Sequence, residues 1–384
     1  MTTWDAVVVG AGPAGSATAL LLARSGARVL LLDRARFPRD KPCSEYLSPE
    51  STTVLERLGG GIFEAVAAAS HARLTGMKVV APSGREMIGR FDRNGERFSF
   101  ALPRTSFDMI LRRAAETAGA VVREGVKVED LTVGGVIAAR ETHRARVVVG
   151  ADGLRSVVAR RLGGVRTSPP RRVAFTAHVA DVAGVSDVGE MHVGHEGYVG
   201  LGPIGDGVTT VALVVPVRTV KQARPHFFET LDGFPGLAGR FDPRRIVRDV
   251  LATGPFAQWS RRAVAPGGGA LLVGDAADFF DPFTGQGIYS ALRGAELAAA
   301  AITDTLTTGA DLRAYARARR REFSGKWLLE RLIALGVGWP ALVERVVGRL
   351  ARRSDLADLL VRATGNCVPA RAVLAPGVLA GLLW

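Results

Sequence analysis

The chain is poor in cysteine and lacks long apolar runs. Cys43 and Cys367 are its two cysteines among 384 residues. They are too few for a disulfide framework, so we expect a reducing compartment and a cytoplasmic protein. No stretch reaches the roughly 20 apolar residues that a membrane-spanning helix needs. The first residues run directly into a predicted strand, which argues against a signal peptide.

Acidic residues are outnumbered, and arginine carries most of the positive charge. Asp and Glu total 37 against 50 Lys and Arg, which gives a net charge of +13. The arginines are spread in ones and twos, a distribution that argues against nucleic-acid binding. Their densest run, "ARARRREF" (316–323), is interpreted as a solvated helix face. A basic protein nevertheless attracts anionic ligands such as phosphates.

The N-terminus has the pattern of a βαβ unit with a glycine loop. The apolar run "TWDAVVVG" leads into "GAGPAG" (10–15), a helical stretch follows, and "RVLLLD" (28–33) is the next buried strand. Gly10 permits the tight turn, Gly12 lets a pyrophosphate approach the backbone, and Gly15 lets helix and strand pack closely. The start of the helix then offers free N–H groups to phosphates.

Asp33 ends the second strand of this unit. A carboxylate at that place binds a ribose diol and disfavours a 2′-phosphate. The loop is therefore predicted to hold FAD or NAD rather than NADP.

Two later strands also end in an Asp. In "GADGLRS" (150–156) a strand delivers Asp152 and Gly153 into a turn before a helix, which by itself indicates no more than a capped helix. In "LLVGDAADFFDPFTGQG" (271–287) Asp275 follows an apolar strand, and its carboxylate can accept hydrogen bonds from a polyol chain.

The glycines after Asp275 complete a second predicted cofactor contact. Pro282, Gly285 and Gly287 let the backbone lie close to a flat ring, and the next helix directs its positive N-terminal end at that ring. A flavin suits this arrangement because its reduced form is an anion.

These three motifs, in this order, resemble the FAD-dependent monooxygenase superfamily typified by p-hydroxybenzoate hydroxylase. Within it the chain is most similar to the branch that contains geranylgeranyl reductases and flavin-dependent halogenases. "FPRDKPCSEYLSP" (37–49) resembles a segment of that branch, and Ile288 stands where hydroxylases of the superfamily usually carry Asn.

Together, pattern and resemblance predict an α/β protein. A discontinuous Rossmann-type FAD-binding domain should receive an inserted β-sheet substrate domain and be followed by a helical C-terminal region. The expected limits are 1–70, 100–165 and 268–310 for the FAD-binding domain, 71–99 and 166–267 for the substrate domain, and 311–384 for the helical region. Within the first of these, Ser106 is placed to cap the helix "SFDMILRRAAETAGA".

The resemblance also implies site residues. Arg104 should lie near the FAD phosphates, and Asp152 belongs to a motif linked to both FAD and NAD(P)H. The expected FAD site comprises Gly10, Gly12, Pro13, Ala14, Gly15, Asp33, Arg34, Arg104, Val126, Asp152, Gly153, Gly274, Asp275, Pro282, Gly285, Gln286, Gly287 and Ile288. We expect no metal site. NAD(P)H should act as a transient electron donor, since no second glycine loop is present.

The leading hypothesis is an NAD(P)H-dependent monooxygenase that uses O₂ to hydroxylate or epoxidise an apolar or aromatic metabolite. The alternative is a reductase of prenyl double bonds, for which Cys43 matches a cysteine that some such reductases keep near the flavin. A flavin-binding protein without turnover is the third hypothesis. Halogenation is disfavoured, because the Trp-x-Trp-x-Ile-Pro motif of the halogenases is missing.

Other residues carry weaker expectations. "HEGYVGLGP" (195–203) matches a pocket-lining segment in relatives, which makes His195 and Tyr198 catalytic candidates. Strand alternation places His178, together with Phe175, on the expected pocket face. The apolar C-terminal segment from residue 368 should pack on the body of the protein, with a weak membrane-surface contact as the second interpretation.

Overall fold

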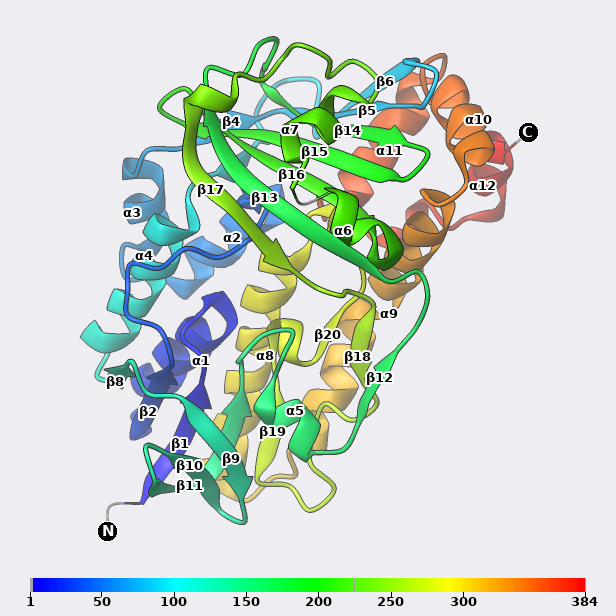
Figure 1. The fold of residues 1–384 in the computed structure, drawn as a ribbon. Coiled ribbons are helices and arrows are strands. Elements are labelled where there is room, and N and C mark those ends of the chain that lie inside the picture. The colour runs from blue at the N-terminus through cyan, green and yellow to red at the C-terminus, as the bar shows by residue number, and fades with distance from the viewer. Residues whose placement is uncertain (1–2, 224, 384) are drawn as a thin grey trace.

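Two seven-stranded sheets organise the part of the chain that the computed structural model describes, residues 3–223 and 225–383 (Figure 1). The first sheet has the order β8-β2-β1-β11-β10-β9, with β19 beside β11. Its parallel strands are β8 (Val121–Glu124), β2 (Val29–Asp33), β1 (Trp4–Val9), β11 (Glu141–Gly150) and β19 (Ala270–Leu272). β9 (Val128–Thr132) and β10 (Gly135–Ala138) add an antiparallel hairpin.

The carboxyl ends of these parallel strands meet at one edge of the sheet. β1 ends before Gly10, β2 at Asp33, β11 at Gly150 and β19 just before Gly274. Strands covered on both faces are apolar throughout, as the fully buried run at 29–32 shows. Motifs that lie 260 residues apart in the sequence are thereby gathered at a single edge, where open α/β sheets bind ligands.

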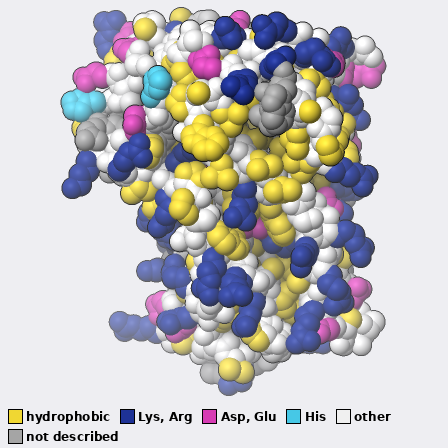
Figure 2. All heavy atoms as spheres, turned by 90° about the vertical axis from the view of Figure 1, so that its right-hand side faces the viewer, with side chains coloured by type: hydrophobic (Ala, Val, Ile, Leu, Met, Phe, Trp, Pro, Cys, Tyr) yellow, Lys and Arg dark blue, Asp and Glu magenta, His cyan; other side chains and the backbone are white. Residues whose placement is uncertain are grey.

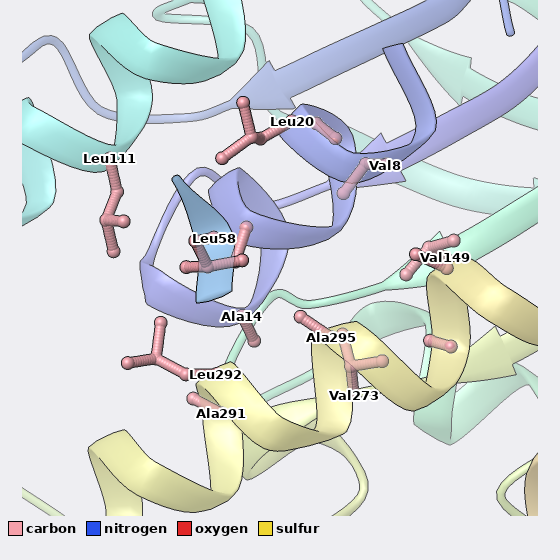
Figure 3. Packing of buried hydrophobic residues seen from close by; sticks show 14 of the residues in the cluster. Val8, Ala14, Leu20, Leu58, Leu111, Val149, Val273, Ala291, Leu292 and Ala295 are labelled. Atoms are coloured by element: carbon pink, nitrogen blue, oxygen red, sulfur yellow. The ribbon is translucent and has the colours of Figure 1, made fainter. Parts of the chain in front are cut away.

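Small residues allow close helix packing beneath this edge. α1 (Pro13–Arg24) packs against α8 (Gly287–Thr308), and Figure 3 shows Ala14 of α1 near Ala291 and Leu292 of α8. α2 (Pro49–Leu58), α3 (Ile62–Ala68) and α4 (Arg104–Thr117) extend the same core. α4 begins at Arg104 after Pro103, so the expectation that Ser106 caps this helix is wrong.

The second sheet lies above the first in Figure 1 and has the order β17-β13-β16-β15-β14-β5-β6. Its strands are β5 (Gly76–Val80), β6 (Glu86–Arg90), β13 (Arg172–Ala180), β14 (Val188–Gly194), β15 (Gly197–Gly205), β16 (Val208–Pro216) and β17 (Ile246–Thr253). All neighbours are antiparallel except β14 and β5. β5 and β6 thus pair into a sheet whose other strands lie about a hundred residues further along the chain.

Short elements connect the two large sheets. One small sheet contains β3 (Tyr46–Leu47), β7 (Ser99–Ala101) and β4 (Ala72–Leu74), and another contains β12 (Val165–Thr167), β18 (Gln258–Ser260) and β20 (Asp278–Phe279). The helices α5 (Val157–Arg161), α6 (Val220–Ala223) and α7 (Phe227–Asp232) are also short. The α/β class is confirmed, while the exact domain limits stay a prediction.

The C-terminal region is helical, as predicted. It contains α9 (Arg313–Gly336), α10 (Pro340–Leu350), α11 (Ser354–Thr364) and α12 (Pro376–Leu383). Val373 and Leu382 are buried in a core shared with these helices, so the C-terminal segment packs on the body of the protein. Within the described residues, no helix combines the length and apolar character needed to cross a membrane.

Candidate functional site

A cavity of about 590 Å³ lies where the carboxyl edge of the first sheet meets the second sheet. Gly10, Asp33 and Asp152 line it from the first sheet, and Thr176 and Tyr198 from the second. The inner face of α9 closes a further side. The cavity is therefore lined by residues of the first sheet, of the second sheet and of the C-terminal helical region.

The glycine loop meets this cavity through Gly12. A Cβ atom added at Gly12 would find its nearest neighbour, an Arg39 nitrogen, 3.5 Å away, which is an ordinary van der Waals contact, so the fold has room for a side chain there. A Cβ atom at Gly15 would lie 1.8 Å from the carbonyl oxygen of Gly10. Gly15 therefore serves helix packing, as predicted. Gly15 and Ala14 are not among the cavity-lining residues, and their predicted ligand contact, which would be made through their backbone N–H groups, stays a prediction.

The start of α1 is open to an anion. Its N-cap residue is Gly12, and no side chain among the described residues caps the first turn. The first N–H groups of a helix lack intrahelical acceptors and carry partial positive charge. This end of the helix fits a phosphate.

Asp33 joins the loop to the end of β2. One carboxylate oxygen accepts a hydrogen bond from the Ala11 N–H at 2.7 Å, and the other accepts one from Ala35 at 2.8 Å. Each oxygen keeps a second lone pair, and the side chain lines the cavity beside Arg34 and Val126. The position fits the predicted ribose contact.

The Asp152 side chain is hydrogen-bonded within the turn that leads into α5. Its carboxylate accepts hydrogen bonds from the Ser156 hydroxyl and from the Val157 N–H, the latter at 2.6 Å, and so fixes the start of α5. Burial raises the pKa of Asp152, and these hydrogen bonds oppose the rise. Gly153, with φ of +77°, is open to the cavity, since a Cβ atom there would meet no described atom within 4 Å.

The turn that follows β19 forms another wall. Asp275 forms an ion pair with Lys41 at 3.2 Å, and Gly285 adopts a φ of +64° just before α8 begins. Gln286 is 2% exposed, and its amide nitrogen and oxygen have no hydrogen-bond partner among the described residues. Unpaired buried amide atoms are costly. A polar ring edge beside Gln286 would satisfy them, so this turn fits the expected flavin.

Arg104 lies in the cavity wall, held by carboxylate contacts. It makes two hydrogen bonds of 2.7 Å with Asp108, which also pairs with Arg39 at 3.1 Å. Burial by itself lowers the pKa of Arg104, but the Asp108 carboxylate more than offsets this and raises it. A fixed cation fits the predicted place near a phosphate.

Cys43 lines the cavity on a loop held by buried charges. Its sulfur accepts a hydrogen bond from the Glu45 N–H at 3.3 Å. Glu45 has the unusual φ of +60° and is fully buried. Its carboxylate lies 2.6 Å from His178 Nε2 and 3.5 Å from Arg248. His178 thus supports this loop, whereas Phe175 packs on the opposite face of the sheet, contrary to expectation.

Only one of the two candidates in the segment 195–203 reaches the cavity. His195 is exposed in the turn between β14 and β15 and is absent from the cavity lining, so the expectation for it is corrected. Tyr198 lines the cavity and donates its hydroxyl hydrogen bond to Asp281, which also pairs with Arg172 at 2.7 Å. Burial and Asp281 raise the pKa of Tyr198 well above its ordinary value. Its proton is therefore tightly held.

The sequence patterns did not reveal the contribution of α9. Lys326 and Glu330, one turn apart, both line the cavity, and Lys326 Nζ lies 3.6 Å from the centroid of the Tyr289 ring. Burial lowers the pKa of Lys326 and raises that of Glu330. Arg319 is buried in an ion pair with Asp278, which corrects the interpretation of the whole arginine run as solvated.

The rest of the lining is predominantly apolar. It comes from the second sheet, the loop after β17, the segment after β19 and α9, and comprises Ala174, Met191, Val214, Ala252, Phe256, Phe279, Phe280, Phe323 and Trp327. The cavity thus combines polar strand ends with a hydrocarbon and aromatic wall, as ligand sites commonly do.

Comparisons with known proteins agree with this geometry. Residues 3–326 match the family described as FAD binding domain. The menaquinone reductase of Mycolicibacterium smegmatis is 30% identical over 394 residues, which cover 96% of this chain and 92% of that protein. The digeranylgeranylglycerophospholipid reductase of Methanothrix thermoacetophila is 30% identical over 354 residues, which cover 85% of each.

Solved structures share the fold. A flavoprotein/dehydrogenase from Cytophaga hutchinsonii has a TM-score of 0.84 at 20% identity, with 98% of this chain and 96% of that chain covered. The myxobacterial chondrochloren halogenase has a TM-score of 0.77 at 23% identity, with 87% and 82% covered.

Proposed function

This chain belongs to the family of flavoproteins that share this FAD binding domain, and from that premise we propose that it is a reductase of carbon–carbon double bonds in a prenyl lipid. That it is an FAD-dependent oxidoreductase follows from the family. The finer assignment rests on the predominantly apolar wall of the cavity, which suits a hydrocarbon chain. The names of the two reductase relatives support it.

The residues that would hold FAD follow from the site. The loop at Gly12 and the start of α1 would bind its pyrophosphate, and Asp33 its ribose. Gln286 and Gly287 would contact the flavin ring, near the start of α8. When bound, FAD supplies hydride-transfer chemistry, and NAD(P)H is the proposed source of the electrons.

The remaining lining residues would orient the substrate and provide a proton. The apolar wall binds the prenyl chain and excludes water from the double bond. Saturation adds a hydride to one carbon of the bond and a proton to the other. We assign the proton to Cys43 Sγ, whose loop the Glu45–His178 pair holds in place. The thiolate then recovers a proton from solvent.

Hydroxylation or epoxidation with O₂ is the competing function. Phe256, Phe280 and Trp327 in the cavity wall favour it, because an aromatic substrate packs well on such side chains. The two reactions differ in the atoms they add, so a single product analysis separates them.

The test uses the purified full-length protein loaded with FAD. A geranylgeranyl lipid is incubated with NADPH or NADH, with and without oxygen, and the products are analysed by mass spectrometry. We expect an anaerobic gain of two hydrogen atoms for each saturated bond. A gain of one oxygen atom, only in air, would support the monooxygenase instead. Bound FAD without any product from either arm would favour a flavin-binding protein without turnover. Failure to bind FAD would contradict the assignment as an FAD-dependent oxidoreductase.

Cys43→Ala tests the proton assignment. Loss of a general acid is expected to lower the reduction rate by about 100-fold, with FAD content unchanged. Cys367→Ala is the matched control, since Cys367 is outside the cavity lining. An unchanged rate in Cys43→Ala would remove Cys43 from the mechanism and leave the reductase proposal to the product analysis.

A further inference from the structure

Helix α9 has two faces of different character. Its inner face lines the cavity through Phe323, Lys326 and Glu330. Its outer face is formed by positions three or four residues apart, which share one side of a helix. In order they are Arg317, Arg321, Ser324, Leu328, Leu332 and Leu335, and Trp339, the N-cap residue of α10, follows just beyond the helix end.

The outer row is strongly exposed. The exposed fractions are 51% for Leu328, 45% for Leu332, 56% for Leu335 and 71% for Trp339. Single exposed apolar residues are common, but a row of four large ones marks an interaction surface. Figure 2 looks at the side of the molecule that carries α9. In the upper half of this view hydrophobic side chains gather, with Lys and Arg side chains around them.

We propose that this row, the outer face of α9 from Arg317 to Leu335 together with the adjoining Trp339, docks the protein on an anionic lipid bilayer. Leucines and a tryptophan on one side, flanked by arginines, are the composition of helices that lie in the membrane interface. Tryptophan in particular prefers the headgroup level. Arg317 and Arg321 extend the same row, where they would meet anionic headgroups.

Charge favours a bilayer over a second copy of the chain. The chain has a net charge of +13, and none of the seven positions in the row is acidic. Two copies that met through this face would bring together two positively charged molecules, and the row has no acidic residue to pair with an arginine of the other copy, which is unfavourable. An anionic surface is complementary to the same residues.

The location of α9 links this surface to the cavity, a step that rests on the proposed function. In the same turns of α9, Leu328 and Leu332 face outward and Glu330 faces the cavity. A prenyl lipid resident in the bilayer would therefore be separated from the cavity by a single helix. Docking through α9 would bring the cavity to its substrate.

Vesicle co-sedimentation of the FAD-loaded protein tests the docking surface without any assay of activity. Vesicles of phosphatidylcholine are compared with vesicles of equal parts phosphatidylcholine and phosphatidylglycerol. We expect binding mainly to the anionic vesicles, and at least about tenfold weaker binding for the double variant Leu332→Ser with Leu335→Ser. Arg317→Gln with Arg321→Gln should reduce the preference for anionic vesicles.

Val133→Ser is the control, because Val133 is a fully exposed apolar residue in the β9–β10 turn, far along the chain from α9. It should bind vesicles as the unchanged protein does. Equal binding by the leucine variant, or no vesicle binding at all, would overturn the docking proposal. A dimer in solution that the leucine variant converts to a monomer would assign the face to a second copy instead. The reductase proposal is judged separately by its products in detergent.

Discussion

Gly12 and Gly15 lie three residues apart and have different tasks. Gly12 has an ordinary extended φ of −73° and faces the cavity, whereas Gly15 is pressed against the Gly10 carbonyl. A methyl group is therefore tolerated by the fold at the first position and rejected at the second. The pair separates ligand binding from stability within one motif.

We predict that Gly12→Ala leaves the free energy of unfolding of the apoprotein within about 0.5 kcal/mol of the unchanged protein. Its affinity for FAD should fall by at least about tenfold, because the methyl group occupies the path of the pyrophosphate. Gly15→Ala should lower the free energy of unfolding by about 3 kcal/mol, since the added methyl group would overpack the contact with Gly10 and push α1 away from the end of β1. Urea unfolding and FAD fluorescence titration measure the two effects. Normal FAD affinity in Gly12→Ala would contradict the assigned phosphate contact.

At the scale of elements, a buried charge cluster attaches β5 to the second sheet. Glu190 of β14 is the cross-strand partner of Lys78 in β5 and forms an ion pair with it at 3.0 Å. The same carboxylate binds Arg240 at 2.9 Å and His192 at 2.8 Å, and it is 1% exposed. Burial alone would raise the pKa of Glu190, but the hydrogen bonds from His192, Arg240 and Lys78 hold it well below its ordinary value.

A lowered carboxylate pKa implies stability that is present at neutral pH and lost in acid. We predict that Glu190→Gln lowers the free energy of unfolding by about 3 kcal/mol at neutral pH, because it breaks a buried charge network. The difference should shrink below about pH 4, where Glu190 becomes protonated in the unfolded chain while it stays ionised in the folded protein, so that its contribution to stability is progressively lost. Urea unfolding across this pH range measures it. Glu196→Gln, in an exposed ion pair with Arg218, is the control and should have little effect at any pH.

At the scale of the whole molecule, the proposed FAD site lies where the two large sheets meet. A ligand that binds only the folded protein stabilises it by mass action. We predict that FAD at 100 times its dissociation constant raises the free energy of unfolding by about 2.7 kcal/mol. Thermal or urea unfolding of the apoprotein with and without FAD measures this gain. Gly12→Ala at the same FAD concentration should show a smaller gain, and an equal gain in both would place the ligand elsewhere.

The sequence by itself determined the features that depend on neighbouring residues. The glycine spacing in 10–15, the Asp at the end of β2 and the helical character after residue 311 are local patterns, and the structure has each of them. Four glycines interrupt β15, whose sequence is "GYVGLGPIG", and glycine weakens the local preference for strand, so this strand depends on its neighbours in the sheet. The exposed position of His195 likewise depends on where the β14–β15 turn falls.

Only the tertiary structure decided which distant residues meet. Lys41 reaches Asp275 across 234 positions, and His178 reaches Glu45 across 133. Such contacts depend on how the two sheets and α9 are packed, and a local pattern carries no information about a partner so far away. The two faces of α9 were decided in the same way: its helical pattern could be predicted, but which side would cover the cavity and which would remain exposed depended on the surface against which it packs.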